Sequence, residues 1–468
     1  MSRLARAARG VGLLSLTAAL SCTPEPGAAT IDGLDLPTGL AEDPEGRWLF
    51  VSNGNWDRAA SSSALVVLDL EALAAGIAAP RSAGAGLDRD HPCREHDEDL
   101  RVECDDALLS IPDLGVRIPS GAGNIAIDRP SGPEGSLRLL IPTRHEPGIT
   151  WVDAYGPGFG TDDPAEPLRL ECGQNDRRVC DSKHFVGVGS DPSRLSVDTL
   201  GFRYAYLPHL LGRRLTLLDL DSELGPEVVD VFDDFFREDE LFDTGLGGGF
   251  AVVQRACDVD GNAPISTIDC TRPFLFASQR FWEGMRVFRV ASGLDVIVGG
   301  RDVAIEGPSL ESAEPKPLMG GLVYEDPEQG DRLLLVHTTP PALSRIDTSV
   351  GSGDPRTRLL DTVSLCSNPN VVVVHRPELL GHPGPRLAAV SCYGSDEVAI
   401  VDLGVFVVVA TVSVGNGPNE LLIDAERQWL FVANTAESTL SLIDLDASSP
   451  GYLREVATVG LGSGTREE

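Results

Sequence analysis

The chain has 468 residues, of which 42% are hydrophobic, and its mean hydropathy of −0.02 suits a soluble protein with an ample core. Its formal net charge of −33 excludes nucleic acid as a partner, because that binding needs a basic surface to neutralise phosphates. The 50 glycines and 33 prolines predict the many turns that short strands require.

Residues 1–21 have the features of an export signal. Three arginines precede the apolar run Val11–Leu20, which is too short to cross a bilayer, since a spanning helix needs about 20 apolar residues. The run ends at Ala19-Leu20-Ser21-Cys22, which resembles a bacterial lipobox, although Ala19 replaces the usual Leu. We expect lipidation of Cys22, with ordinary cleavage and no lipid as the alternative. Loss of three arginines would take the net charge from −33 to −36.

The rest of the chain is predicted to be an exported protein held in the cell envelope by this lipid alone. Thr23 is not the Asp that favours retention in the inner membrane, so we expect the outer membrane, with the protein facing the periplasm or the exterior. Residues 22–36 are predicted to form a tether, residues 37–460 one folded domain, and residues 461–468 a flexible tail.

A repeated phrase runs through the predicted domain. Each copy has a turn rich in Gly, Pro and Asn, an apolar strand, a polar hairpin, a second apolar strand, a turn, and a third strand that ends in Asp in six of seven copies. The second strand is WLFVSN at 48–53 in the first copy and WLFVAN at 429–434 in the last. The five copies between have second strands at 138–143, 204–209, 274–279, 333–338 and 387–392, and fourth strands fit at 184–188, 227–232, 358–363 and 405–414.

Four-stranded units repeated around an axis predict an all-β protein, a seven-bladed β-propeller of antiparallel blades. A linear β-solenoid is the rival, but its coils are shorter and lack internal hairpins. Either Thr30-Ile31 or Val456–Val459 could supply the strand that closes the ring.

The phrase of turn, Pro, strand, hairpin, LFVAN, turn, strand and Asp resembles the YVTN-type propellers, a superfamily shared with lactonase-like propeller enzymes. The resemblance covers roughly residues 37–460 and implies the fold. No catalytic residue of the lactonase group maps onto the motif, which marks a strand.

Eight cysteines remain after Cys22, and an exported protein meets an oxidising compartment. The simplest pairing joins sequential neighbours: Cys93–Cys104, Cys172–Cys180, Cys257–Cys270 and Cys366–Cys392. The first three pairs fall in insertions at 71–108, 156–183 and 255–272, which are predicted on the face opposite the funnel described next and offer a competing binding face.

In the predicted ring, one face carries the loops that lead into the innermost strands and the turns between second and third strands. We call it the funnel face. Its turns contribute Asn53, Arg144, His145, His209, Gln279, Arg280, Thr338, Tyr393 and Asn434, and its loops contribute Thr38, Asn124, Arg194, Asn370, Asn419 and Glu420. His337 lies one place before this row and could point inward or into a blade interface.

Two residue types stand out at the funnel face. His145, His209 and His337 could bind a metal or transfer protons, or could simply bond to local backbone. Arg144, Arg194 and Arg280 could seat a carboxylate or phosphate group, or could pair with neighbouring acids.

Cofactor motifs are weak. The stretch 91–106 combines His91 and His96 with two cysteines, but oxidised cysteines are favoured over zinc in an exported protein. Residues 258–262 partly match the start of an EF-hand calcium loop and lack its later Glu, so no cofactor is expected and calcium is the alternative.

The sequence therefore favours a non-catalytic binding or scaffolding module whose partner is an envelope protein or a glycan. The alternative is a lactonase-like hydrolase in the funnel, with His209 or Glu420 as general base and Arg144 or Arg280 stabilising an oxyanion.

Overall fold

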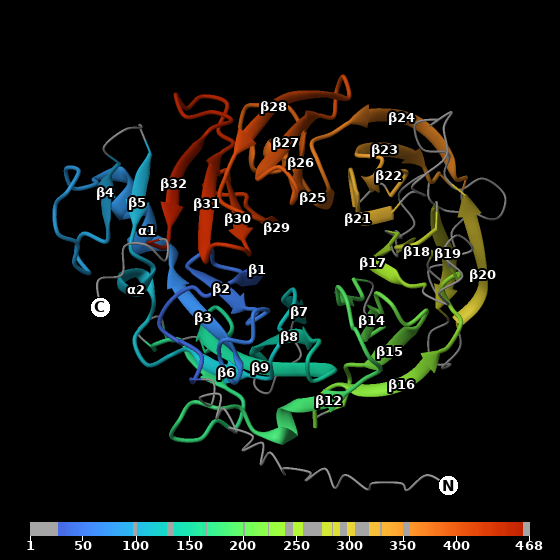
Figure 1. Ribbon diagram of the computed structural model, residues 1–468, viewed down its shortest axis with the longest axis horizontal. Coiled ribbons are helices and arrows are strands. Elements are labelled where there is room, and N and C mark those ends of the chain that lie inside the picture. Colours follow the sequence, from blue (N-terminus) through green and yellow to red (C-terminus); the bar gives the residue numbers. More distant parts are fainter. Residues whose placement is uncertain are drawn as a thin grey trace, which may run out of the picture.

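The computed structural model describes residues 27–96, 101–128, 135–161, 163, 166–199, 202–222, 224–238, 247–255, 274–282, 284–290, 297–304, 318–327, 330–349 and 356–461. Within these ranges seven β-sheets are arranged as blades around a central axis, which Figure 1 shows end-on. The chain is a seven-bladed β-propeller of mostly antiparallel four-stranded sheets, as the repeat predicts. The predicted signal segment and Cys22 lie outside the described residues.

Each blade is a meander whose first strand lies nearest the axis and whose last strand lies at the rim. The first three blades contain β1 (Pro37–Glu42), β2 (Trp48–Asn53), β3 (Ser63–Asp69) and β6 (Val116–Ile118); β7 (Ala126–Asp128), β8 (Leu137–Thr143), β9 (Gly148–Pro157) and β12 (Phe185–Gly187); and β13 (Ser196–Val197), β14 (Tyr204–Pro208), β15 (Leu215–Asp219) and β16 (Glu227–Phe232).

The other four blades follow the same order. They contain β17 (Gly249–Gln254), β18 (Phe274–Gln279), β19 (Gly284–Val290) and β20 (Ile297–Ala304); β21 (Leu318–Tyr324), β22 (Arg332–Thr339), β23 (Ala342–Asp347) and β24 (Arg358–Ser364); β25 (Pro369–His375), β26 (Leu387–Cys392), β27 (Glu397–Asp402) and β28 (Val407–Ser413); and β29 (Pro418–Asp424), β30 (Trp429–Asn434), β31 (Thr439–Asp444) and β32 (Glu455–Val459).

The core lies between the blades, because successive side chains of a strand point to opposite faces of its sheet. In β2, Leu49 and Val51 pack against blade 7, whereas Phe50 packs against blade 2. All three side chains are fully buried. A blade that is apolar on both faces needs a neighbour on each side, which is why the repeats form a closed ring.

The ring closes without exchanging a strand between its ends. Blade 7 consists of the last four strands of the propeller, β29–β32, and Thr30-Ile31 forms no strand. Instead, the insertion at 71–108 of blade 1 reaches blade 7 along the rim. This insertion contains α1 (Leu70–Ala78), β4 (Cys93–Glu95), β5 (Val102–Cys104) and α2 (Asp106–Leu109).

The insertion fastens blade 7 through its β-hairpin. Strand β5 pairs in parallel with β32, so β4 and β5 extend that sheet to six strands. Arg101 Nη1 lies 2.7 Å from Glu455 Oε2, and the N–H of Gly460 donates to the carbonyl of Cys104 at 2.9 Å. Figure 1 shows β4 and β5 outside β32 at the left edge of the ring. We call the paired strands β4 and β5 the latch.

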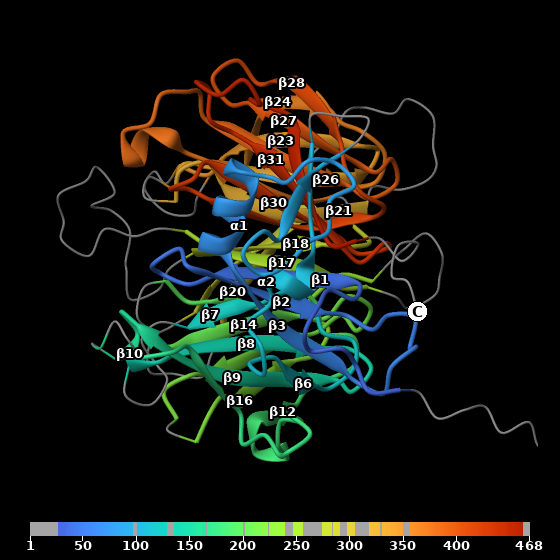
Figure 2. The same cartoon turned by 90° about the vertical axis from the view of Figure 1, so that its left-hand side faces the viewer.

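Other additions decorate the ring. Blade 2 carries β10 (Gly160–Thr161), β11 (Arg169–Glu171) and the short helix η2 (Ser182–His184), and blade 6 carries the short helix η3 (Pro377–Leu380). Figure 2 shows α1 and α2 against the rim in the side view. No helix among the described residues is long and apolar enough to cross a membrane.

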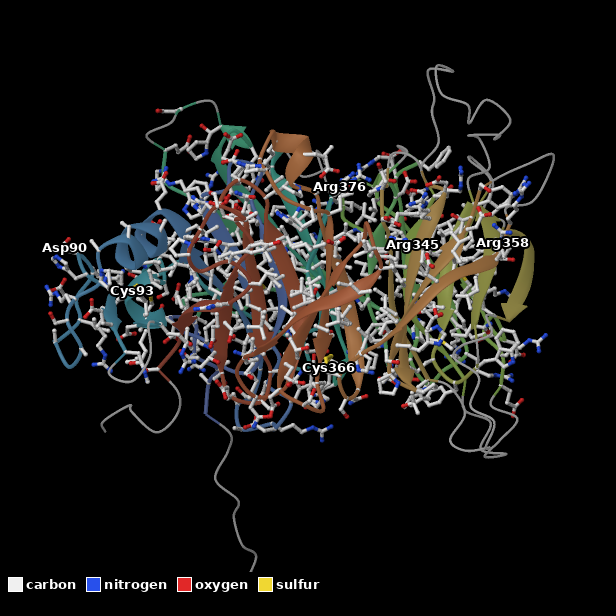
Figure 3. The ribbon with its side chains drawn as sticks, turned by 90° about the horizontal axis from the view of Figure 1, so that it is seen from above. Asp90, Cys93, Arg345, Arg358, Cys366 and Arg376 are labelled. Atoms are coloured by element: carbon white, nitrogen blue, oxygen red, sulfur yellow. A yellow bond between two sulfur atoms is a disulfide. The ribbon has the colours of Figure 1, made fainter. Side chains whose placement is uncertain are left out.

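Three of the four predicted disulfides are confirmed: Cys93–Cys104, Cys172–Cys180 and Cys366–Cys392. Cys257 and Cys270 lie outside the described residues. Figure 3 shows the ring edge-on, with Cys366 at one face and Arg376 at the opposite face. The disulfides indicate an oxidising, extracellular or periplasmic location.

The latch predicts different roles for two disulfides that close loops of similar length, 11 residues for Cys93–Cys104 and 8 for Cys172–Cys180. Loop-closure entropy in the unfolded chain contributes similarly to both, at roughly 2–4 kcal/mol. Of the two disulfides, only Cys93–Cys104 lies within the latch, where it joins β4 to β5, the strand that pairs with β32. We expect the double variant Cys93→Ser/Cys104→Ser to speed hydrogen exchange in β32, measured by mass spectrometry. If the control Cys172→Ser/Cys180→Ser speeded hydrogen exchange in β32 to the same extent, the proposed role of the latch would be contradicted.

Candidate functional site

Side chains reach the axis where the innermost strands begin. In blades 1, 4, 5, 6 and 7 the pairing of the first two strands shifts register at this point. Such a bulge leaves residues out of the ladder and re-aims their side chains. Thr38, Phe250, Asn370 and Asn419 all lie at these shifts, and all line the central cavity.

Glycines let these strands approach one another closely. A Cβ atom on Gly39 of β1 would lie 2.4 Å from the carbonyl oxygen of Gly123 in blade 2. A Cβ atom on Gly320 of β21 would lie 2.6 Å from the carbonyl oxygen of Asn370 in blade 6. A side chain at either position would push neighbouring blades apart at the axis.

A cavity of about 590 Å³ lies at the funnel face, which is within the size range of about 300–1,000 Å³ for small-molecule sites. Polar, charged and aromatic side chains from different blades converge on it. Its charged residues are Asp57, Arg144, Arg194, Arg280 and Glu420, and its aromatic residues are Trp56, Phe250 and Tyr393.

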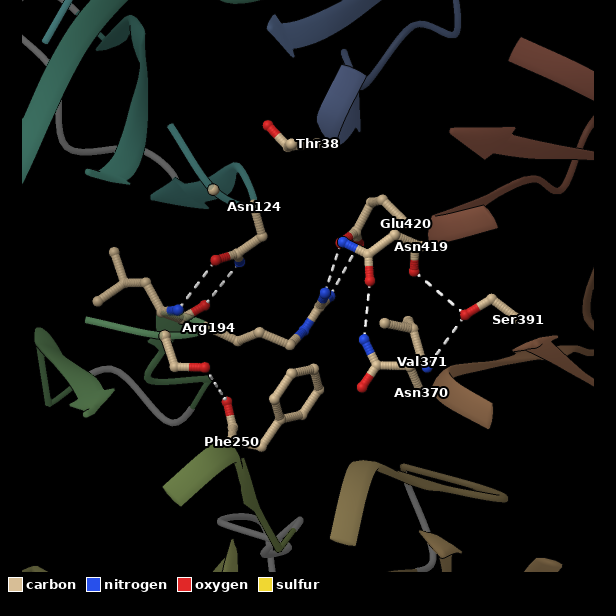
Figure 4. Close-up of polar contacts among 12 residues, drawn as sticks. Thr38, Asn124, Arg194, Phe250, Asn370, Val371, Ser391, Asn419 and Glu420 are labelled. Atoms are coloured by element: carbon tan, nitrogen blue, oxygen red, sulfur yellow. Dashed lines mark hydrogen bonds and ion pairs between the residues drawn. The ribbon is translucent and has the colours of Figure 1, made fainter. Parts of the chain in front are cut away.

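The centre of the site is occupied by an ion pair between distant blades. Arg194 precedes the inner strand of blade 3, and Glu420 lies on the inner strand of blade 7. Arg194 Nη2 donates to Glu420 Oε1 at 2.8 Å, and Nη1 donates to Oε2. Figure 4 shows Arg194 reaching across the central region to Glu420. Burial lowers the pKa of Arg194, but the charge and hydrogen bonds of Glu420 outweigh it and raise the pKa above its usual value.

Hydrogen bonds between neighbouring blades hold the other polar groups in place. Asn124 donates to the carbonyl of Leu195 at 3.1 Å and accepts from the Leu195 N–H at 3.0 Å. Asn370 Nδ2 donates to Asn419 Oδ1 at 2.7 Å, while Asn370 Oδ1 is buried without a hydrogen-bond partner in the described part of the structure. Figure 4 shows these contacts around the axis. The site is therefore largely preformed, and one amide oxygen is left without a hydrogen bond.

The two remaining arginines differ in their partners. Arg144 Nη2 pairs with Asp191 Oδ1 at 2.6 Å, and its guanidinium lies 5.2 Å from the centre of the Trp56 ring. Arg280 Nη1 donates to the carbonyl of Met319 at 2.9 Å and to Thr338 Oγ1 at 3.2 Å. Arg280 has no acidic partner in the described part of the chain. Burial, together with the charge of Arg144, lowers the pKa of Arg280 to about 10.

The structure brings some of the predicted funnel-face residues to the cavity and places the others elsewhere. Those that line it are Thr38, Asn124, Arg144, Arg194, Arg280, Asn370, Tyr393, Asn419 and Glu420, and those that do not are Asn53, His145, His209, Gln279, His337, Thr338 and Asn434.

The residues away from the cavity are mostly enclosed. His209 is fully buried: Nδ1 contacts the carbonyl of Ser190 and Nε2 contacts Thr216 Oγ1, both at 2.8 Å. Burial lowers its pKa. His337 is also fully buried, and neither ring nitrogen has a hydrogen-bond partner among the described residues. His145 is half-buried beside Ser120 and Trp56.

The two asparagines make structural hydrogen bonds, Asn53 to the segment before β1 and Asn434 across the turn between β30 and β31. Asn53 Nδ2 donates to the carbonyl of Gly33 at 2.9 Å, and Asn434 Nδ2 donates to Thr439 Oγ1 at 2.9 Å. Both side chains are buried. Both asparagines at the end of the second strand therefore serve the fold and do not face the cavity.

Sequence reasoning missed Trp56, Phe250 and Asp191. Phe250 follows the triple glycine Gly247–Gly249, which marks a loop into an inner strand, so its position carried a usable signal. Asp191 becomes visible only through its contact with Arg144, which lies in another blade. No three or more His, Cys, Asp or Glu side chains of the described residues are grouped as a metal site would require. Residues 258–262 lie outside that part.

Solved structures with a similar fold include a candidate 6-phosphogluconolactonase from Bacteroides fragilis, which is 13% identical, has a TM-score of 0.56, and aligns over 90% of this chain and 98% of that chain. Kuenenia stuttgartiensis hydrazine synthase is 14% identical, has a TM-score of 0.50, and aligns over 88% of this chain and 96% of that chain. No family model and no curated protein matches the chain. At these identities the likeness establishes the propeller fold alone.

Buried His337 predicts a pH dependence of stability. Burial lowers the pKa of His337 from 6.5 to about 4. Between these two pH values the unfolded chain therefore binds a proton at His337 and the folded chain does not. The contribution of His337 to the free energy of unfolding is fully present above about pH 6.5, and it falls by up to about 3 kcal/mol toward pH 4. We expect melting temperatures between pH 7 and pH 4.5 to fall more steeply for the wild type than for His337→Leu. Parallel curves would contradict this assignment.

Proposed function

We propose that this protein is a non-catalytic binding module that holds a small organic ligand in the central cavity of the propeller. The observation that carries the proposal is the cavity of about 590 Å³ on which polar and aromatic side chains from different blades converge. Convergent polar groups in a preformed pocket are typical of small-molecule sites.

The state of the candidate bases favours binding over catalysis. A general base must reach the proton that it removes. His209 is enclosed in the blade, and both oxygens of Glu420 are engaged by Arg194. The described residues that line the cavity include no histidine.

A lactonase-like hydrolase remains the second candidate. The neighbour from Bacteroides fragilis carries a 6-phosphogluconolactonase name, and Arg144 and Arg280 are cations that could stabilise an oxyanion in the same cavity. Asp57, which is exposed at the cavity, is the carboxylate that such an enzyme would have available.

We further propose that the module is lipidated at Cys22 and anchored in the outer membrane. The support comes from the lipobox-like sequence at 19–22 and from Thr23, together with the disulfides of the folded domain. An envelope protein or a glycan as a macromolecular partner stays a prediction from the sequence.

Blocking the cavity tests the binding function. Ala436 is exposed and lines the cavity, so Ala436→Trp should fill the mouth without disturbing the core. A library of metabolites would be screened by thermal shift against the purified protein. A ligand at about 100 times its dissociation constant adds roughly 2.7 kcal/mol of stability, which gives a clear shift.

We expect stabilising ligands to act on the wild type and to lose their effect on Ala436→Trp. The matched control is Val405→Trp, whose site is 67% exposed and lies outside the cavity lining. Ligands that stabilise Ala436→Trp and Val405→Trp equally would contradict binding in the cavity. Turnover of a sugar lactone by the wild type, lost in Ala436→Trp, would overturn the non-catalytic assignment in favour of the hydrolase.

A further inference from the structure

Resting on the proposed cavity function, we infer that the ligand is an organic monocarboxylate whose carboxylate group is bound by Arg280. This residue follows β18 in blade 4 and lines the cavity. Its Nη1 is used by the protein itself, through Met319 and Thr338. Its Nε and Nη2 groups have no hydrogen-bond partner among the described residues, and they form one edge of the planar guanidinium. That edge matches the two oxygens of a carboxylate.

Arg280 differs from the arginines of this protein that form enclosed ion pairs. In two such pairs, Arg138 Nε lies 2.8 Å from Asp153 Oδ1, and Arg345 Nε lies 3.0 Å from Glu325 Oε2. The chain has 71 acidic residues against 38 basic ones, so acids are in excess. Within the described structure, the cavity side of Arg280 is thus left for a group that the protein does not supply.

The surroundings of Arg280 make an anion more favourable still. Its guanidinium lies 5.5 Å from the centre of the Phe250 ring, and the second cation of the cavity, Arg144, is near enough for its charge to act on Arg280. A partly buried cation beside a like charge is destabilised, because little water remains to solvate it. A bound anion would offset both effects.

The charged residues of the cavity favour a ligand with one negative charge. Arg194 is paired with Glu420 and Arg144 with Asp191, so Arg280 is the arginine of the described cavity lining that has no acidic partner. Asp57 also lines the cavity and would repel a second negative charge. A carboxylate carries one charge, whereas a phosphate monoester carries nearly two at pH 7.

The size and lining of the cavity require more than a simple ion. The space of about 590 Å³ is bounded by Trp56, Phe250 and Leu210 as well as by amide side chains. An organic body with apolar surface would fill the space beside these residues, while its carboxylate meets Arg280. Asn370 Oδ1, which lacks a partner, could accept a hydrogen bond from the same ligand.

Titration calorimetry with matched probes tests the inference. The probes are benzoate, cyclohexanecarboxylate and hexanoate, each compared with its uncharged amide, and phenyl phosphate compared with benzoate, all at one ionic strength. We expect the protein to bind at least one carboxylate roughly tenfold or more tightly than its amide, and benzoate more tightly than phenyl phosphate. Arg280→Gln should weaken carboxylate binding by roughly tenfold or more, since it removes charge-assisted hydrogen bonds.

Two control variants separate ligand binding from folding. Arg358→Gln replaces an arginine that is exposed on β24 and should bind the probes like the wild type (Figure 3). Without ligand, Arg280→Gln should melt near the wild-type temperature, because removal of a cation without an acidic partner offsets the loss of its hydrogen bonds to Met319 and Thr338. Arg194→Gln should melt lower, because Glu420 would lose its partner. A lower melting temperature for ligand-free Arg280→Gln would mark Arg280 as structural and overturn the inference.

The remaining outcomes distinguish this inference from the proposed function. Binding that Ala436→Trp abolishes but that is equal for carboxylates and amides, or unchanged in Arg280→Gln, would overturn the carboxylate site and leave the cavity function standing. Tighter binding of phenyl phosphate than of benzoate would overturn the choice of a monoanion. Failure of every probe and of the metabolite library to bind would overturn both proposals.

Discussion

Packing between neighbouring blades is the interaction on which the rest of the structure depends. Every blade is apolar on both faces, so no blade is stable until it is enclosed by two others, and the ring must close. At the closing interface the two neighbours come from opposite ends of the chain. Leu49 and Val51 of blade 1 pack there with Phe431 and Leu440 of blade 7. Because no strand is exchanged, side-chain packing and the latch hold this interface.

The same closure creates the functional site. The ring brings the starts of all seven inner strands to one axis, and bulges at five of them turn side chains toward the centre. Arg194 and Glu420, which are 226 residues apart in sequence, meet only because blades 3 and 7 share that axis. Loss of closure would therefore separate the residues of the cavity as well as destabilise the fold.

The sequence predicted most of the fold because the blade repeat is carried by local patterns. Strand β16 spans the predicted residues 227–232, and β18 spans the predicted residues 274–279. The latch could not be predicted, because β4 and β5 are three residues each and their partner lies some 350 residues away. Their short length leaves no periodicity, and parallel pairing with β32 depends on the finished ring.

The site was predictable in position and less so in detail. Repeat register placed Arg144, Arg194 and Arg280 at the funnel face, and all three line the cavity. The repeat register could not distinguish Arg144 and Arg194, which pair with acids, from Arg280, which does not. The acidic partners, Asp191 and Glu420, lie in other blades than the arginines that they contact. The repeat register also could not show that His209 and His337 are enclosed, since one residue of register decides whether a side chain faces the axis or a blade interface.

A crystal structure of the protein with a monocarboxylate, benzoate in the first instance, would test the central claim most directly. We expect the carboxylate of the ligand to lie in the central cavity within hydrogen-bond distance of Arg280 Nε and Nη2, with the Arg194–Glu420 pair unbroken. A ligand bound at the opposite face or at the rim, or one whose carboxylate points away from Arg280, would contradict the assignment of the funnel as a carboxylate-binding site.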